Sequence, residues 1–177
     1  MNLAIIPHND DESLFLAFTL MREHPLVVIV TDSWMQYNRG TGITADLRWS
    51  ETVKAMEILH CPVIRLGIRD DVIDEWFVRR ELSKFVGFDK VYAPALQGGH
   101  TDHDVIAKVA KELFPSCIQY MTYSPTDLYT IGSHEIKPTP EELQIKEKVL
   151  MCYESQYSLS ATKPHFEAVK GKSEWYI

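Results

Sequence analysis

Short apolar runs alternate along this chain with longer segments that have the spacing of amphipathic helices. This alternation is typical of β-α-β units, in which helical crossovers join the parallel strands of one sheet. The runs are β-branched or aromatic enough to be strands buried on both faces. The pattern therefore predicts an α/β fold with five strands, at Leu3–Ile6, Leu26–Thr31, Val63–Leu66, Lys90–Ala93 and Ile118–Tyr123.

Helices are expected between these strands and after the last one, at Ser13–Arg22, Ala45–Leu59, Asp74–Phe85, Asp104–Leu113 and Glu141–Tyr153. The last of them follows Thr139-Pro140 and has acids in its first turn, which is a common helix start. Residues 33–44 are polar and have no period, so we expect a loop over the site there. The tail after Gln156 is left unassigned, apart from a docked end at Trp175-Tyr176-Ile177.

Composition narrows the class of protein. A chain of 177 residues with 45% hydrophobic content can bury one ordinary core, so we expect a single domain over residues 1–177. The net charge of −7 argues against a nucleic-acid partner, which would require a basic surface. Cys61, Cys117 and Cys152 suit neither a disulfide framework nor a four-thiolate zinc site. Without an apolar stretch of roughly 18 residues, we expect a soluble, cytoplasmic protein, and a homo-oligomer is left open.

A polar turn, Pro7-His8-Asn9-Asp10-Asp11-Glu12, lies between the first expected strand and the first expected helix. The carboxyl ends of strands are where open α/β sheets bind ligands. Three acids crowded into one turn repel each other unless a positive group lies among them. Histidine and acids at a helix start often serve only as caps, so capping is the alternative interpretation. A bound divalent metal is the simplest explanation of the cluster.

A second polar turn, Gly98-Gly99-His100-Thr101-Asp102-His103-Asp104, follows the fourth expected strand. Because parallel strands share one carboxyl edge, the two turns can converge on one point. His8 and Asp11 are three residues apart at a helix start, which places them on one face. With His103 as a third ligand, two imidazoles and one carboxylate make the usual shell of a catalytic zinc site.

Three further residues of these turns are candidates for catalysis. Asp10 lies beside the expected ligand Asp11 but points elsewhere, so we expect it to be the general base for a metal-activated water. His100 is expected either to stabilise an oxyanion or to protonate a departing amine. Asp102 is expected to orient the imidazole of His100.

The two turns, in this order, resemble the signature of the PIG-L/LmbE-type zinc-dependent N-acetylglucosaminide deacetylases: a His-Pro-Asp-Asp-Glu turn and a later His-x-Asp-His. The resemblance implies one zinc ion per chain held by His8, Asp11 and His103, with Asp10 as general base and His100 as an electrostatic or acid partner. Weaker family features are Arg48 with Glu51, Leu66-Gly67 followed by Asp70, and Lys148 through Ser155-Gln156. The chain departs from the family in its short length and in Asn9, which replaces the usual proline and is expected to loosen the turn.

Several residues are candidates for substrate contact, each with an alternative. Arg48 is expected to bind a substrate hydroxyl or phosphate, or else to pair with Glu51 or Asp46 on a half-solvated helix face. Asp70 is expected to bind sugar hydroxyls, or else to cap the next helix. Trp34, Tyr37 and Trp49 could stack on a sugar ring or cover an edge of the core. No function is assigned to the three cysteines or to the remaining histidines, His24, His60, His134 and His165.

The overall expectation is a Rossmann-like three-layer α/β fold with a mainly parallel β-sheet. The expected activity is metal-dependent hydrolysis that removes an N-acetyl group from an amino sugar of the GlcNAc type, free or in a glycoside. Hydrolysis of another amide or a phosphoester is the alternative, although phosphoesterases usually assemble more ligands around two ions. A noncatalytic nucleotide-binding module is disfavoured because no G-x-G-x-x-G follows the first strand.

Overall fold

The computed structural model describes residues 1–32, 40–70 and 72–177. Within these ranges seven strands form one sheet, in the order β3-β2-β1-β4-β5-β7-β6. Their bounds are β1 Leu3–Ile6, β2 Leu26–Thr31, β3 Val63–Ile68, β4 Val91–Pro94, β5 Ile118–Tyr120, β6 His134–Ile136 and β7 Glu174–Tyr176. Neighbouring strands from β3 to β5 run parallel, whereas β7 is antiparallel to both β5 and β6. The predicted mainly parallel α/β fold is confirmed.

The helices are short, and their bounds are α1 Asp11–Phe15, α2 Ala17–Glu23, α4 Ala45–Leu59, α5 Glu75–Leu82, α6 Thr101–Leu113, α7 Pro140–Leu150, α8 Glu154–Tyr157 and α9 Lys163–Val169. Thr139 starts α7 with a complete capping box, in which its hydroxyl and the side chain of Glu142 each accept a backbone N–H of the other residue. Across the described ranges, no helix combines the length and the apolar character that a bilayer crossing requires.

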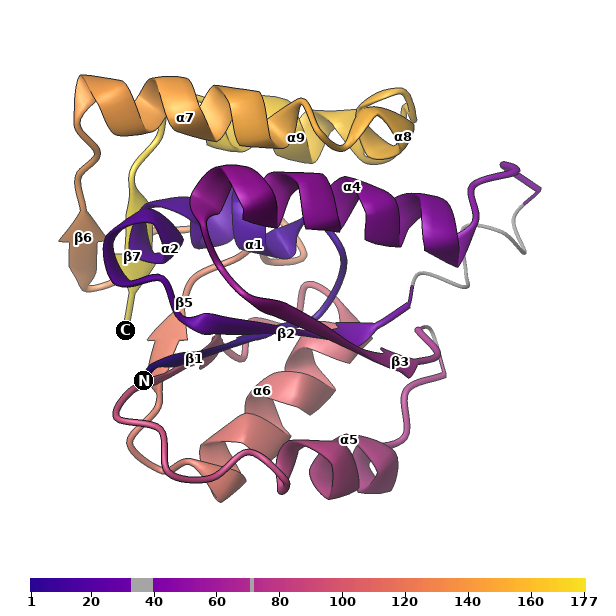
Figure 1. The fold of residues 1–177 in the computed structure, drawn as a ribbon, viewed down its shortest axis with the longest axis vertical. Helices are drawn as coiled ribbons and strands as arrows, with labels where there is room; N and C mark the ends of the chain where they lie inside the picture. Colours follow the sequence, from indigo (N-terminus) through magenta and orange to yellow (C-terminus); the bar gives the residue numbers. More distant parts are fainter. Residues whose placement is uncertain (33–39, 71) are drawn as a thin grey trace.

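The elements are arranged in layers (Figure 1). Helices α5 and α6 cover one face of the sheet, while α1, α2 and α4 cover the other. The C-terminal helices α7, α8 and α9 lie outside this second group and contact α1 and α4. The predicted three-layer arrangement is thus confirmed, with the C-terminal helices as an added cover.

The central strands β1, β2 and β4 are buried on both faces, whereas β3 is only partly buried, and β1 divides its side chains between two cores. Ala4 and Ile6 belong to the core beneath α1, α2 and α4, whereas Leu3 and Ile5 belong to the core beneath α5 and α6. Side chains of a strand alternate between its faces, so a fully apolar run fits only a strand covered on both sides. Strand order also reverses at β1, which places the carboxyl ends of β1 and β4 on either side of a switch point.

The single helix expected over Ser13–Arg22 is instead two helices separated at Leu16, which has φ −134° and ψ 8°. The backbone groups freed by this break have buried partners from the end of the chain. Lys146 Nζ donates to Leu14 O at 2.9 Å, and Glu174 accepts from the N–H of Phe18 at 3.1 Å. Tertiary contacts therefore satisfy the interruption, and local helical spacing alone does not reveal it.

Candidate metal centre and active site

The two polar turns meet at the switch point of the sheet. The first turn joins β1 to α1 and carries His8, Asp10 and Asp11, while the second leads from β4 into α6 and carries His100 and His103. These groups come together because β1 and β4 are adjacent and parallel, so their carboxyl ends lie side by side.

Three side-chain atoms from these turns form a compact triangle. His8 Nδ1 lies 3.1 Å from both Asp11 Oδ2 and His103 Nε2, and His103 Nε2 lies 3.0 Å from Asp11 Oδ2. Zinc bonds of about 2.0–2.2 Å would separate tetrahedral ligand atoms by roughly 3.3–3.6 Å, only slightly more than is observed. These three residues are the three expected ligands, and their donor set and spacing fit one divalent metal. His8, His100 and Asp102 form a second, overlapping group whose ligand atoms also lie close together.

The outward nitrogens of both imidazoles face oxygen atoms. His8 Nε2 lies 2.9 Å from Asp102 Oδ2, and His103 Nδ1 lies 3.4 Å from Thr122 Oγ1. Contacts of this kind fix the orientation and tautomer of metal-binding histidines. Asp102 was expected to orient His100, but its carboxylate is 3.9 Å from His100 Nδ1. The fully buried Asp102 carboxylate lies closer to His8, and Asp102 contacts the His100 ring through its backbone N–H, 3.2 Å from Nδ1.

His100 is the N-cap of α6, and its Nδ1 accepts the backbone N–H of Asp102 at 3.2 Å. A neutral His100 therefore carries its proton on Nε2. Burial lowers the pKa of His100 to about 4, and the nearby His8 and His103 act in the same direction. Its ring lies edge-on to that of His8 with 4.7 Å between centroids, so His100 is a neutral donor beside the ligand triangle.

The electrostatics of the triangle favour a cation. Burial by itself would lower the pKa of His8, but the carboxylates of Asp102 and Asp11 outweigh burial and raise this pKa to about 10. Burial would likewise raise the pKa of Asp11, yet His103 and His8 hold it well below its ordinary value. Without an ion, the two carboxylates retain a proton on His8, and a bound metal would supply the same positive charge.

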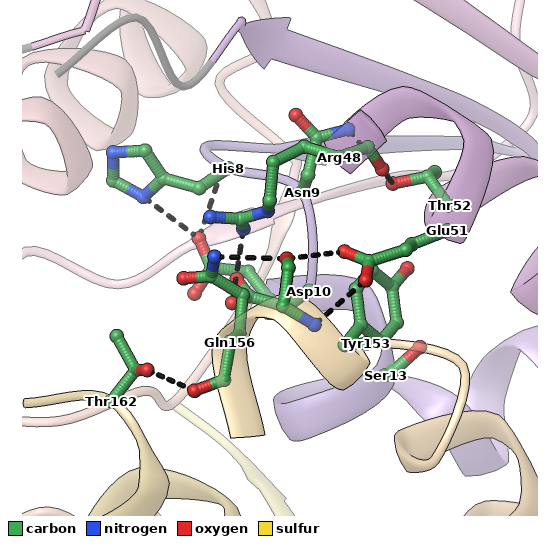
Figure 2. A network of polar contacts seen from close by, with 12 residues as sticks. His8, Asn9, Asp10, Ser13, Arg48, Glu51, Thr52, Tyr153, Gln156 and Thr162 are labelled. Atoms are coloured by element: carbon green, nitrogen blue, oxygen red, sulfur yellow. Dashed lines mark hydrogen bonds and ion pairs between the residues drawn. The ribbon is translucent and has the colours of Figure 1, made fainter. Parts of the chain in front are cut away.

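Asp10 has an unusual backbone, with φ 119° and ψ −31°. A positive φ at a non-glycine residue costs about 1–3 kcal/mol and persists only where the surroundings impose it. The carboxylate of Asp10 pairs with Arg48 of α4, with 3.0 Å between Oδ2 and Nη2 (Figure 2). Burial raises the pKa of Asp10 to about 8, although Arg48 opposes the shift.

Arg48 is only 3% exposed. The expected alternative of a half-solvated pair with Glu51 or Asp46 is wrong, because the guanidinium reaches Asp10 and Asp46 instead pairs with Arg65 at 3.2 Å.

Helix α4 also makes hydrogen bonds to the first polar turn and to the C-terminal segment. Glu51 accepts the backbone N–H of Ser155 at 2.8 Å and its hydroxyl at 2.6 Å. Asn9 donates to Thr52 Oγ1 at 2.7 Å and is 1% exposed. Asn9 was expected to loosen the turn, but its side chain instead ties the turn to α4. The weak family features at Glu51 and Ser155 are in direct contact.

The other candidates for substrate contact are Asp70 and three aromatic residues, Trp34, Tyr37 and Trp49. Asp70 is buried at the carboxyl end of β3, two strands from β1. Trp34 and Tyr37 lie outside the described residues. Trp49 packs against the core on α4, with the Arg65 guanidinium 5.9 Å from its ring centroid. These contacts agree with the alternative in which Trp49 covers an edge of the core.

Two aromatic residues at the site were missed by the reasoning from sequence. The Tyr123 ring lies 5.1 Å from the His103 ring and 4.7 Å from the ring of His165 on α9. His165 was assigned no function because the sequence shows no partner pattern around it. The one available signal was the position of Tyr123 at the end of the fifth expected strand, on the same carboxyl edge as the two turns.

Comparison with known proteins identifies the family of this chain. No curated protein sequence matches the chain. The profile of PIG-L, described as GlcNAc-PI de-N-acetylase, matches residues 3–114, a range that contains both polar turns and α4. It spans more than half of the chain and supports a deacetylase-type enzyme.

Solved structures show the same fold at low sequence identity. A triple mutant of a deacetylase from the teicoplanin biosynthetic pathway has 18% identity and a TM-score of 0.73, over 99% of this chain and 96% of that one. The 4-carboxy-2-hydroxymuconate hydratase GalB from Pseudomonas putida KT2440 has 14% identity and a TM-score of 0.72, over 95% and 82%. A conserved protein from Thermus thermophilus has 18% identity and a TM-score of 0.67, over 99% and 93%.

Since a hydratase is among these neighbours, the fold by itself does not define the reaction. The family is shown by the profile match over the segment that contains the ligand triangle, Asp10 and His100. This chain belongs to the PIG-L family, GlcNAc-PI de-N-acetylase.

Proposed function

We propose that this protein is a zinc-dependent hydrolase that removes an N-acetyl group from an amino sugar of the GlcNAc type. One observation carries the proposal: the triangle of His8, Asp11 and His103 has a buried carboxylate, Asp10, and a neutral imidazole donor, His100, next to it. A metal site, a base and a hydrogen-bond donor are the groups that amide hydrolysis needs.

His8, Asp11 and His103 would hold the metal, and two imidazoles with one carboxylate are donors that suit zinc. When bound, the ion supplies a Lewis acid for the amide carbonyl and lowers the pKa of a water molecule. We propose one ion per chain. Asp102 and Thr122 support the binding by fixing the imidazoles of His8 and His103.

Asp10 is the proposed general base. Arg48 holds Oδ2 of Asp10 at 3.0 Å, so the carboxylate has a defined orientation. The carboxylate takes a proton from the attacking water, while Arg48 compensates its charge in a buried setting. His100 donates from Nε2 to the oxyanion or to the departing nitrogen, because its Nδ1 is occupied by the backbone N–H of Asp102.

Arg48 and Asp70 are the proposed contacts to the sugar. Among the described residues, Arg48 Nε is buried without a hydrogen-bond acceptor. A sugar hydroxyl would satisfy this donor, since buried polar groups are nearly always paired. One structural neighbour is a deacetylase in complex with teicoplanin. The substrate class that we propose here is a glycoside. The three free cysteines suit a reaction in the reducing cytoplasm.

The test is acetate release by the zinc-loaded protein from a panel of N-acetylglucosaminides, with Asp10→Asn and His103→Ala as variants. Asp46→Asn on the exposed side of α4 is the matched control. Release by the wild type and the control, with loss in both variants, is the expected result. Full activity of either variant would remove the proposal. Zinc binding without release from any sugar would shift the substrate to another amide or a phosphoester.

A further inference from the structure

Glu12 has no part in the proposed reaction, although this residue is fully buried between the active-site turn and the C-terminal helices. Both of its oxygens are engaged. Oε2 accepts the backbone N–H of Asp10 at 3.1 Å, and Oε1 accepts the hydroxyls of Ser13, at 2.8 Å, and of Tyr153. A carboxylate is costly to bury unless hydrogen bonds hold it, so these three donors define its position.

The contact between Glu12 and Asp10 is made at the strained point of the turn. Asp10 has φ 119°, a backbone conformation that side-chain-bearing residues rarely adopt. Its N–H points to the side chain of Glu12 rather than to a helical or sheet carbonyl. The main-chain orientation of Asp10, and with it the direction of the Asp10 carboxylate, therefore depends on where Glu12 is held.

Tyr153 holds Glu12 from the far end of the chain. It lies between α7 and α8, is fully buried, and packs near Phe166 of α9 with 6.5 Å between ring centroids. The family profile ends at residue 114, so Tyr153 is outside the segment that it matches. The C-terminal helices thus contribute a hydroxyl that reaches the active-site turn through one carboxylate.

A second contact from the same segment reaches the other side of Asp10. Ser155 binds Glu51 of α4, and Arg48, which holds the Asp10 carboxylate, lies about one turn before Glu51 on that helix. Residues 153–155 therefore contact Glu12, which binds the backbone of Asp10, and also α4, the helix that carries Arg48.

We propose that Tyr153 is a positioning residue for the reaction: through Glu12 it fixes the main chain of Asp10 and so aims the Asp10 carboxylate. The proposal rests on the proposed role of Asp10 as general base. A tyrosine that only packs in the core would lower stability when altered, but it would leave the turnover number of the folded enzyme unchanged.

The test compares Tyr153→Phe with Tyr157→Phe. Tyr157 also donates to a glutamate, Glu167, from the same helical layer, but this hydrogen bond is exposed, whereas the one from Tyr153 to Glu12 is buried. For Tyr153→Phe, we expect kcat to fall about ten-fold or more with KM changed less than about two-fold, because small displacements of a catalytic group are costly. Zinc stoichiometry should stay at the wild-type value, and Tyr157→Phe should match the wild type throughout. A wild-type kcat in Tyr153→Phe would overturn the proposal.

A second readout does not depend on activity. Hydrogen exchange at the Asp10 amide, followed by NMR in the metal-free protein, should be about ten-fold faster or more in Tyr153→Phe than in Tyr157→Phe. Equal exchange rates at the Asp10 amide in the two variants would overturn the proposed coupling between Tyr153 and Asp10. If the wild type released no acetate, or if Asp10→Asn stayed active, the proposed function would fail. The exchange rate would still show whether Tyr153 holds the backbone of Asp10 through Glu12. Glu12→Gln, which keeps the side-chain size, replaces Tyr153→Phe in both assays if that variant does not fold.

Discussion

The carboxylate of Asp102 lies 2.9 Å from Nε2 of His8, although the two residues are 94 positions apart in the chain. Asp102 is in the first turn of α6, and His8 follows β1. The adjacent ends of β1 and β4 bring them together, and the contact leaves His8 Nδ1 directed at Asp11 and His103. One carboxylate therefore aims a candidate metal ligand that belongs to the other polar turn.

Replacing Asp102 should weaken metal binding. In Asp102→Ala, the His8 ring loses the acceptor that fixes it, and changes of this kind cost about 10–100-fold in metal affinity. Competition with a chromophoric chelator measures the zinc affinity. Asp46→Asn is the control, because Asp46 is exposed on α4 and pairs with Arg65. Equal affinities of Asp102→Ala and the wild type would contradict the prediction.

His60 ends α4 in the left-handed region, with φ 55° and ψ 37°. Glycine adopts this conformation without the steric cost of a Cβ, so His60→Gly should raise the free energy of unfolding by about 1 kcal/mol. For a chain of this size, the melting temperature should rise by about 2–4 °C in calorimetry. His60→Ala retains the Cβ and should show no such gain, and a rise as large in that variant would refute the explanation.

Asn9 ties the active-site turn to α4 by donating to Thr52 Oγ1 at 2.7 Å. Because both residues are buried, Asn9→Ala should lower the free energy of unfolding by about 1–2 kcal/mol, measured by urea denaturation. In a Thr52→Val background the same change should cost less, since the acceptor is already absent. Equal costs in both backgrounds would mean that Asn9 acts through another contact.

Glu23 connects α2 to β1 and β4 by accepting from Lys90, Asn2 and Tyr92, each at 2.7 Å. Burial would raise the pKa of Glu23, but these donors outweigh burial and hold it below the ordinary value of 4.5. The stabilising contribution of the carboxylate is therefore complete above about pH 4.5 and is lost as the pH falls through the lowered value.

Glu23→Gln should accordingly destabilise the protein at pH 7 and should show a smaller loss of stability than the wild type as the pH falls below 4.5. Urea denaturation at several pH values measures both effects. The exposed Glu57→Gln on α4 is the control. A Glu23→Gln variant with the acid dependence of the wild type would count against the role given to Glu23.

Much of the fold could be predicted because its central strands are buried on both faces and several of its helices start at recognisable caps. Leu3–Ile6, Leu26–Thr31 and Ala45–Leu59 have the predicted bounds. The three-residue strands β6 and β7 were not predicted, although a docked end was expected at Trp175-Tyr176-Ile177. Strands this short have no period of their own: β7 pairs with β5, and β6 pairs in turn with β7.

The sequence by itself determined which groups meet at the site, because parallel strands share a carboxyl edge and the turns after β1 and β4 must lie beside each other. His8, Asp11 and His103 were found in this way. Only the tertiary structure decided how the side chains pair: Asp102 with His8, Arg48 with Asp10, and Tyr153 with Glu12. It also placed Lys146 and Glu174 at the break in the first helix. Local patterns record the type of residue and its face, whereas the partner of a buried polar group depends on which distant segment packs against it.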